Sequence, residues 1–163
     1  MKIYLINFNS SGLSLVKFHR SLEPSRSAQA DKEAMICAWC LEILHAAFLV
    51  ADDMMDRSTT RRGKACWHLV TDTAPNDVFL LELLVFHLVD KYFAASPKYV
   101  SILALLHDTV MQSILGQNMD IKMNLRQNRQ SFTPHTYASI AEHKTSYYTF
   151  YQPVALAMIL VSF

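Results

Sequence analysis

Residues that break helices are scarce in this sequence. Its 163 residues include only 3 Gly and 5 Pro, whereas hydrophobic residues make up 52% of the total. Few breakers and many Leu, Ala, Met and Ile residues favour long helices. The apolar content is high enough to bury a core, which argues against a disordered chain. The length suits one domain, so we expect residues 1–163 to form a single all-α domain.

An excess of charge of either sign is also lacking. The chain has 15 Lys and Arg residues against 14 Asp and Glu residues, for a formal net charge of +1. That balance gives no reason to expect nucleic acid or an anionic membrane surface as a partner. The first apolar stretch is too short for a signal peptide, and the apolar residues 153–163 are too few to cross a bilayer. We therefore expect no transmembrane segment.

Cysteine is rare, and the number of cysteines is odd. Cys37 and Cys40 form a CxxC pattern within an apolar helical run, and Cys66 stands apart from them. No second CxxC pattern or His pair in the sequence completes a zinc site. We therefore expect buried thiols in a reducing compartment, which predicts a cytoplasmic protein.

The hydrophobic pattern predicts a bundle of about five helices. The second and fourth of these carry apolar residues three or four positions apart, which places each set on one helix face. The two sets are Met35, Trp39, Ile43, Ala47 and Val50, and Leu103, Leu106, Val110 and Ile114. We expect Asn76 or Asp77 to cap the third helix and Pro153 to kink the last one. The predicted helices cover residues 12–22, 28–56, 78–94, 97–124 and 134–163.

Acidic residues gather at the end of the second predicted helix, in the run Asp52-Asp53-Met54-Met55-Asp56. Positions four apart stack on one helix face, so Asp52 and Asp56 point the same way, with Asp53 beside them. Carboxylates held together repel one another unless a cation joins them. Magnesium takes oxygen ligands and often bridges one or two carboxylates to a phosphate, so it is the expected ion. A solvated helix end is the alternative, although the helix dipole disfavours anions there.

Two arginines follow the acidic run closely, in the sequence Arg61-Arg62-Gly63. Guanidinium groups bind phosphate in bidentate fashion and stay charged, and Gly63 lets the backbone turn sharply behind them. Acids that hold magnesium, followed by two arginines, make a clamp for a diphosphate. An exposed loop with incidental arginines is the alternative.

Two later polar pairs are candidates for the same site. Gln117 and Asp120 place an amide and a carboxylate three positions apart on one helix face. Lys144 and Thr145 offer an ammonium and a hydroxyl on the last predicted helix. Taken alone, each pair is better explained as an ordinary polar face, so both depend on the acidic run and the arginines for their interpretation.

Together these motifs resemble those of the farnesyl and geranyl diphosphate synthases, the trans-type isoprenyl diphosphate synthases, and look closest to the animal form. The resemblance runs from about Gly12 to Leu160 without large gaps. It implies the helical isoprenoid (terpenoid) synthase fold, of which this chain would hold the part before the family's second aspartate-rich motif. The resemblance rests on Trp39–Glu42, Phe48–Asp56, Thr60–Gly63, Cys66–Trp67, Gly116–Gln117, Asp120 and Lys144–Thr145.

The resemblance implies a role for each residue of the first cluster. Asp52 and Asp56 would coordinate the Mg²⁺ ions that bridge to an allylic diphosphate, with Asp53 in support. Arg61 would contact the allylic diphosphate. Arg62 would contact the diphosphate of isopentenyl diphosphate, which is the second substrate of the family.

The same resemblance places Lys144 and Thr145 along the allylic site, and Gln117 and Asp120 near the metals. The implied reaction is a head-to-tail condensation in isoprenoid biosynthesis. The allylic diphosphate leaves, a carbocation forms, and the alkene of isopentenyl diphosphate attacks it. Family members usually form homodimers, so a homodimer or a pair with a full-length synthase is expected.

Two features depart from the family pattern where isopentenyl diphosphate binds. The family has a Lys and an Arg just before the glycine that matches Gly12, whereas here Phe8 replaces the lysine and Ser11 the arginine. Residues 1–11 are either a variant of the family sequence or an unrelated N-terminal segment. His45 stands where the family usually has a glutamine, either as a hydrogen-bond donor or as a core histidine.

Two further departures bear on the chemistry and on product length. After Asp120 the only acidic residue is Glu142, so this sequence holds no second aspartate-rich motif. Ala47 and Phe48 occupy positions where the family often has two aromatic residues that form the cavity floor. A methyl group in place of a ring leaves a deeper pocket, which is compatible with a longer product.

Three functions fit these residues. The leading hypothesis is a Mg²⁺-dependent prenyltransferase of the farnesyl type. The second is a catalytically inactive paralogue or fragment that binds an allylic diphosphate or pairs with a full-length synthase. A class I terpene cyclase shares the fold and the first motif, but Arg61-Arg62-Gly63 and Lys144-Thr145 argue against it. We also expect marginal stability, because no later helix covers the apolar residues 153–163.

Overall fold

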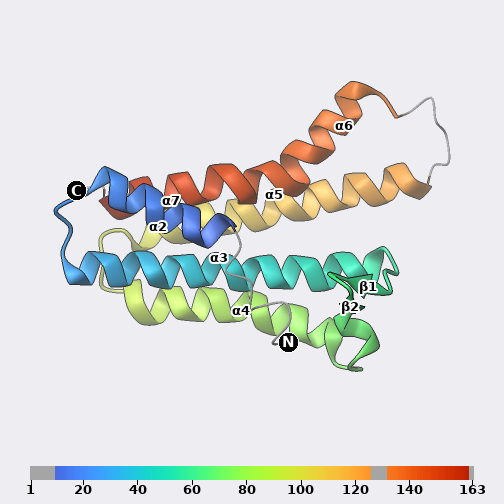
Figure 1. Ribbon diagram of the computed structural model, residues 1–163, viewed down its shortest axis with the longest axis horizontal. Helices are drawn as coiled ribbons and strands as arrows, with labels where there is room; N and C mark the ends of the chain where they lie inside the picture. The colour runs from blue at the N-terminus through green and yellow to red at the C-terminus, as the bar shows by residue number, and fades with distance from the viewer. Residues whose placement is uncertain (1–9, 126–131, 162–163) are drawn as a thin grey trace.

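The computed structural model describes residues 10–125 and 132–161. Within these ranges nearly all regular structure is helical (Figure 1), which confirms the all-α fold class. The helices are α2 (Ser10–Leu22), α3 (Ala28–Met55), η1 (Trp67–Leu69), α4 (Ala74–Phe93), α5 (Tyr99–Leu125), α6 (Pro134–Ala141), η3 (Glu142–Tyr151) and α7 (Gln152–Val161). A two-stranded antiparallel hairpin, β1 (Thr60–Arg61) and β2 (Lys64–Ala65), interrupts them after α3.

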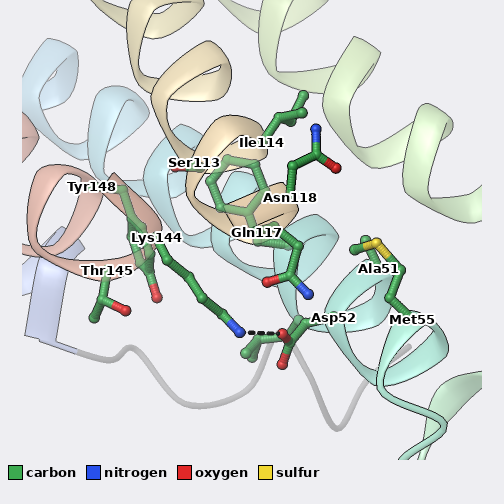
Figure 2. Close-up of a pocket in the computed structure, with 12 residues that line it drawn as sticks. Ala51, Asp52, Met55, Ser113, Ile114, Gln117, Asn118, Lys144, Thr145 and Tyr148 are labelled. Carbon is green, nitrogen blue, oxygen red and sulfur yellow. Dashed lines mark ion pairs between the residues drawn. The ribbon is translucent and has the colours of Figure 1, made fainter. Parts of the chain in front are cut away.

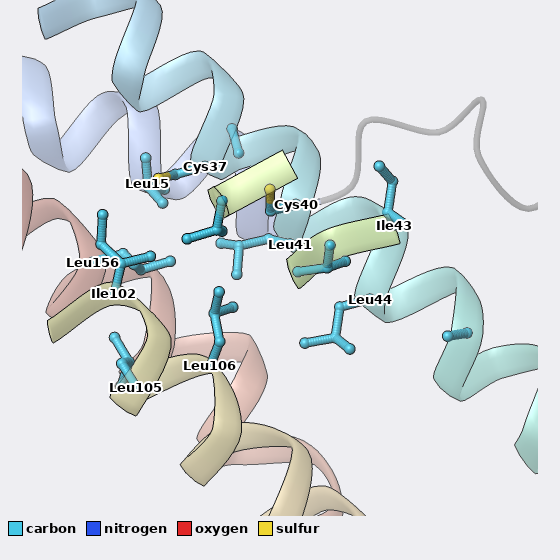
Figure 3. Packing of buried hydrophobic residues seen from close by; sticks show 14 of the residues in the cluster. Leu15, Cys37, Cys40, Leu41, Ile43, Leu44, Ile102, Leu105, Leu106 and Leu156 are labelled. Atoms are coloured by element: carbon cyan, nitrogen blue, oxygen red, sulfur yellow. The ribbon is translucent and has the colours of Figure 1, made fainter. Parts of the chain in front are cut away.

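Helix α3 lies inside the bundle and packs against α2, α4 and α7. Because these helices surround it, the middle of α3 is buried on several sides. Figure 3 shows the cysteines and leucines of α3 close to Leu15 of α2 and Leu106 of α5. The predicted single apolar face was therefore only partly right. Met35 and Trp39 at the start of α3 are 37% and 44% exposed.

All three cysteines are buried, as the sequence predicted. Burial raises the pKa of the Cys40 thiol to about 12 and that of Cys37 well above its ordinary value. A thiol that stays protonated at neutral pH is neither a good nucleophile nor a good metal ligand. Cys37 and Cys40 are therefore structural residues.

Two helices, α3 and α5, are long and apolar enough to cross a membrane by length and composition alone. In α3, 61% of the most apolar window is buried inside the bundle, and in α5 the share is 39%. Core helices of soluble proteins meet the same criterion, so these helices carry little weight as membrane spans.

The end of α3 is shaped by a capping motif that turns the chain toward the hairpin. The Arg57 N–H donates to the Met54 carbonyl at 3.3 Å, and the Ser58 N–H donates to the Asp53 carbonyl at 2.9 Å. These two bonds form a Schellman motif, in which the residue after the cap adopts a left-handed backbone. That residue is Arg57, with φ 54°. The sharp reversal stops α3 directly after its acidic run.

The hairpin turn also uses a left-handed arginine. Arg62 and Gly63 have φ 53° and 75° between the paired strands, as a type I′ turn requires. Gly63 adopts this backbone at no steric cost, and the predicted sharp turn at this glycine is confirmed. Arg62 has a Cβ, so its backbone is strained by about 1–2 kcal/mol.

Replacing Arg62 with asparagine, which tolerates this backbone, is expected to raise the free energy of unfolding by about 0.5–1 kcal/mol. Urea denaturation measures the change. Arg57→Asn relieves the same kind of strain outside the hairpin and is expected to stabilise the fold by a similar amount. Loss of stability in both variants would show that the arginine side chains stabilise the fold more than their backbones strain it.

The start of α4 differs from the sequence prediction. The helix begins at Ala74 after Thr73, and neither Asn76 nor Asp77 caps it. The Asp77 carboxylate instead accepts hydrogen bonds from Trp67 Nε1 at 2.7 Å and from Thr73 Oγ1 at 3.1 Å. This pair of bonds ties the η1 segment after the hairpin to α4.

The last helical run changes its geometry just before Pro153, where the sequence predicted a kink. The last helical run departs from α-helical geometry over Glu142–Tyr151, where η3 is a π-helix that ends before Pro153. The prediction that the apolar C-terminal residues stay uncovered was wrong in part. Helix α2 packs against α7, where Leu156 and Leu160 are buried, whereas Met158 is 56% exposed. Uncovered apolar surface, from which we expected marginal stability, is therefore confined to the outer face of α7.

Candidate active site

The acidic run is held by a single arginine from the hairpin. Arg61 Nε donates to both carboxylate oxygens of Asp53 at 2.9 Å, and Arg61 Nη2 donates to Asp52 Oδ2 at 2.9 Å. Asp53 is only 1% exposed, so this pairing compensates a buried carboxylate. The hydrogen bonds to Asp53 and its negative charge raise the pKa of Arg61, which stays cationic. Asp53 thus anchors the arginine and leaves Asp52 facing the bundle interior.

A lysine from η3 reaches the same acids from the opposite side. Lys144 Nζ lies 3.0 Å from Asp52 Oδ1 (Figure 2). It also lies 2.5 Å from Asp120 Oδ2, so it joins α3 to α5. Burial opposes the charge on Lys144, but hydrogen bonds to Asp120 and Asp52 outweigh it and raise the pKa of its ammonium group. Sequence reasoning named all three residues, but nothing in the spacing showed that they meet.

A glycine makes this meeting possible. Gly116 on α5 lies directly against the backbone of η3, since a Cβ at this position would be 2.2 Å from Lys144 N and 2.6 Å from His143 C. Only a residue without a side chain permits such an approach. Sequence reasoning counted Gly116 as part of a motif and missed this role. Its signal was present, because it is the only glycine after Gly63.

The charged groups stand at the mouth of a cavity of about 140 Å³ between α3, α5 and η3. Its walls are mainly apolar, and the polar groups among its lining residues include those of Asp52, Lys144, Thr145 and Gln117 (Figure 2). Phe48 and Tyr148 meet edge to face in the wall, with ring centroids 5.7 Å apart. The other lining residues are Leu49, Ala51, Met55, Ser113, Ile114 and Asn118. Ala47 is buried but does not line this cavity.

Asp56 lies one turn beyond Asp52, at the exposed end of α3. Burial and repulsion by Asp52 raise the pKa of its carboxyl above the ordinary value, and Lys144 offsets only part of this effect. The run therefore carries negative charge that Arg61 and Lys144 do not fully neutralise. A further cation is the natural complement of such a site.

The residues present fit a magnesium ion of the kind that binds with a phosphate. Within residues 10–125 and 132–161, no three His, Cys, Asp or Glu side chains are placed to hold one metal together. Magnesium usually keeps several waters and takes only one or two carboxylates plus substrate phosphates. Asp52 and Asp120 flank a single ammonium group, so their oxygens are close enough to share a small cation. Asp56 can add a ligand at the exposed side.

Two predicted site residues are not drawn into these contacts. Arg62 is exposed on the hairpin turn, and its charge is near enough to His45 to affect its titration. Thr145 is exposed beside Lys144 at the edge of the cavity. Phe8 lies outside the described residues, whereas Ser11 is buried at the start of α2.

His45, for which the sequence left two alternatives, is partly buried near the cavity wall. Its ring lies edge to face with Tyr148, with centroids 5.3 Å apart. Burial, followed by the positive charges of Arg62 and Arg61, lowers its pKa from 6.5 to about 4. The folded chain therefore holds His45 neutral at pH values where the unfolded chain protonates it.

This depressed pKa predicts a loss of stability in mild acid. Because the folded pKa is the lower one, the stability is complete above about pH 6.5 and falls as the pH drops toward 4. At pH 5 the loss attributable to His45 is about 2 kcal/mol. His45→Gln is expected to reduce the drop between pH 7 and pH 5 in urea denaturation, whereas His87→Gln, at an exposed position, is expected to leave it unchanged. Equal drops in both variants would contradict this assignment.

Comparison with known proteins agrees with this geometry. A model of the polyprenyl synthetase family matches residues 10–163. The chain belongs to the polyprenyl synthetase family. It is 43% identical to the farnesyl pyrophosphate synthase of Kluyveromyces lactis over 154 residues, which cover 89% of this chain and 43% of that relative. It is 42% identical to the farnesyl pyrophosphate synthase of Gallus gallus over 163 residues, covering 92% and 43% respectively.

The human farnesyl pyrophosphate synthase is 38% identical over 156 residues, covering 91% of this chain and 37% of that relative. The resemblance to farnesyl diphosphate synthases drawn from the motifs is thus confirmed across most of the chain. The fungal and avian relatives are about equally similar to it. The chain spans less than half the length of these polyprenyl synthetase relatives.

Proposed function

We propose that the protein is a Mg²⁺-dependent prenyltransferase of isoprenoid biosynthesis that condenses an allylic diphosphate with isopentenyl diphosphate to a farnesyl-type diphosphate. One observation carries the proposal. Asp52, Asp120, Arg61 and Lys144 form a cluster of ion pairs, and two of its members, Asp52 and Lys144, also line a mainly apolar cavity. A ligand with a diphosphate at one end and a hydrocarbon at the other matches both parts. The similarity to farnesyl pyrophosphate synthases supports the same reaction.

Each group at the mouth has a distinct task in this proposal. Asp52 and Asp56 hold magnesium, with Asp120 close by, and the bound metal supplies positive charge for the departing diphosphate. Arg61 stays oriented by Asp53 and presents its guanidinium group toward the same diphosphate. These charges stabilise the leaving group as negative charge builds on it.

Lys144 and Thr145 complete the allylic site. The Lys144 ammonium already lies among the acids, so it needs only a small movement to reach a diphosphate oxygen. The apolar wall, including Phe48 and Tyr148, keeps water from the carbocation that forms when the diphosphate leaves. Arg62 sits on the exposed hairpin turn, where it binds the diphosphate of isopentenyl diphosphate.

A second candidate is binding without turnover, alone or paired with a full-length synthase. Ser11 favours it, because a buried hydroxyl stands where the family resemblance expects an arginine for isopentenyl diphosphate. Exposed apolar side chains on α4 favour pairing, since Phe79 and Leu83 are 64% and 66% exposed. In either case we propose a cytoplasmic protein that pairs with a second copy of itself or with a longer relative.

Incorporation of labelled isopentenyl diphosphate into an apolar-extractable product tests the proposal. The reaction contains an allylic diphosphate and either Mg²⁺ or a chelator. Product that requires both the metal and the allylic substrate supports the prenyltransferase. Product that is cyclic would indicate a terpene cyclase instead. Folded protein that binds the allylic diphosphate but makes no product would select the second candidate.

A further inference from the structure

Helix α5 contacts the π-helix η3 at a second place besides Gly116. The Tyr147 hydroxyl of η3 donates a hydrogen bond to Asp108 Oδ2 on α5, and Gln112 Nε2 donates to the other oxygen of Asp108 at 3.4 Å. Burial, followed by the hydrogen bond to Asp108, raises the pKa of Tyr147, so its hydroxyl stays protonated and donates at neutral pH. Asp108 is exposed and Tyr147 is partly buried, and in the described part of the chain neither residue lines the cavity.

The two contacts hold η3 at two points along α5. Asp108 and Gly116 are eight residues apart, which is about 12 Å along the helix axis. They contact Tyr147 and Lys144 respectively. The contact at Gly116 sets how close the two backbones come, but a glycine has no side chain that could fix the rotation of η3 about its own axis. The hydrogen bond from Tyr147 supplies that restraint.

Rotation matters in η3 because its geometry is π-helical. The Gln152 N–H donates to the Tyr147 carbonyl, five residues back, whereas an α-helix would pair residues four apart. The two kinds of turn hold different numbers of residues, so reversion to an α-helix would change the direction of Lys144 relative to Tyr147. The Tyr147 and Tyr151 rings also pack together at the end of this segment, with centroids 4.7 Å apart. A fixed Tyr147 therefore fixes the direction of Lys144, three residues earlier.

We infer that Asp108 and Tyr147 are positioning residues. Their hydrogen bond fixes the rotation of η3 and so keeps the Lys144 ammonium between Asp52 and Asp120, 3.0 Å from Asp52 Oδ1. When the hydrogen bond is lost, η3 rotates more freely and Lys144 leaves the two acids more often. The positioning of Lys144 is independent of the reaction at the site, whereas its consequence for diphosphate binding rests on the proposed function.

Amine-specific labelling of the folded protein, followed by mass spectrometry, tests the inference at Lys144. Lys98 is the internal reference, because its side chain is 24% exposed against 25% for Lys144, and its ammonium donates to the Leu160 carbonyl at the opposite end of α5. Tyr147→Phe removes only the hydroxyl. It is expected to raise the ratio of Lys144 to Lys98 labelling about threefold to tenfold, the change that loss of one hydrogen bond of ordinary net strength produces. Tyr92→Phe, the same substitution at an exposed position of α4, is expected to leave the ratio unchanged.

Substitutions at Asp108 separate positioning from general stability. Asp108→Asn keeps an oxygen that accepts from Tyr147 and is expected to match the parent. Asp108→Leu removes the acceptor and is expected to match Tyr147→Phe. Because both residues act through one hydrogen bond, combining Asp108→Leu with Tyr147→Phe is expected to give no further rise in the ratio.

A raised ratio in the variants without the hydrogen bond, with a parental ratio in Asp108→Asn, supports the inference. A parallel rise at Lys98 and Lys144, which marks general loosening of the fold, overturns it, as does an unchanged ratio. Calorimetric titration with inorganic pyrophosphate and Mg²⁺ tests the consequence, and Tyr147→Phe is expected to bind about threefold to tenfold more weakly than the parent. If the unsubstituted protein binds no pyrophosphate, the proposed function fails, while the labelling still decides the role of Asp108 and Tyr147.

Discussion

Gly116→Ala is expected to lower the free energy of unfolding by about 3 kcal/mol and to move Lys144 away from Asp52. A Cβ at Gly116 would lie 2.2 Å from the backbone nitrogen of Lys144, where no flexible side chain can move aside. In an isolated helix the same change would be stabilising by about 1 kcal/mol. A loss of stability in Gly116→Ala would therefore show that the close contact between α5 and η3 is present. Either α5 or η3 must shift, and η3 carries the lysine.

Urea denaturation measures the loss of stability, and labelling with an amine-specific reagent followed by mass spectrometry measures the accessibility of Lys144. Met111→Ala provides the control, since Met111 lies on the same helix and is 56% exposed. We expect Lys144 to be labelled faster in Gly116→Ala than in the control. An alanine variant as stable as the parent, with unchanged labelling, would show that α5 and η3 do not meet at this glycine.

Asp52→Asn is expected to weaken Mg²⁺-dependent binding of an allylic diphosphate analogue by at least about 100-fold, because loss of even a supporting partner of a metal ligand costs 10–100-fold. The amide keeps the shape of the side chain but removes its charge. Asp52 also contacts both Arg61 and Lys144, so its charge holds the two cationic groups together. In the same variant, the incorporation of labelled isopentenyl diphosphate into product should fall to background.

Asp72→Asn makes the same charge change in an exposed loop residue and is expected to leave binding and turnover unchanged. Calorimetry with a non-reactive allylic thiodiphosphate analogue measures the affinity, and a chelator establishes the metal-independent level. Equal affinity in Asp52→Asn and Asp72→Asn would remove Asp52 from the site, even if the fold is as described.

Most helices could be predicted because they follow from local pattern. Helix α3 begins at Ala28 after the N-cap Ser27, and α6 begins at Pro134 after the N-cap Thr133. Serine and threonine favour N-cap positions, and proline favours the first helical turn. The exposure of Met35 and Trp39 could not be predicted, because it depends on which neighbours surround each end of α3. The π-helix η3 has no simple sequence signal, although it ends two residues before Pro153.

For the site, residue types could be predicted but their pairing could not. Side-chain type alone indicated a metal site at the acidic run and phosphate binding by the two arginines and the later lysine. The bridge from Lys144 to Asp52 and Asp120 spans α3, α5 and η3, so it depends on helix packing that spacing does not encode. The anchoring of Arg61 by Asp53 likewise depends on the Schellman motif and the hairpin that follow α3.

The proposed function requires that the acidic end of α3, Arg61 and Lys144 together bind magnesium and a diphosphate. Calorimetric titration of inorganic pyrophosphate into the protein, once with Mg²⁺ and once with a chelator, measures this directly and without a prenyl chain. We predict saturable binding with Mg²⁺ that disappears in the chelator. Binding of equal strength in both conditions, or in neither, would contradict the assignment of this site.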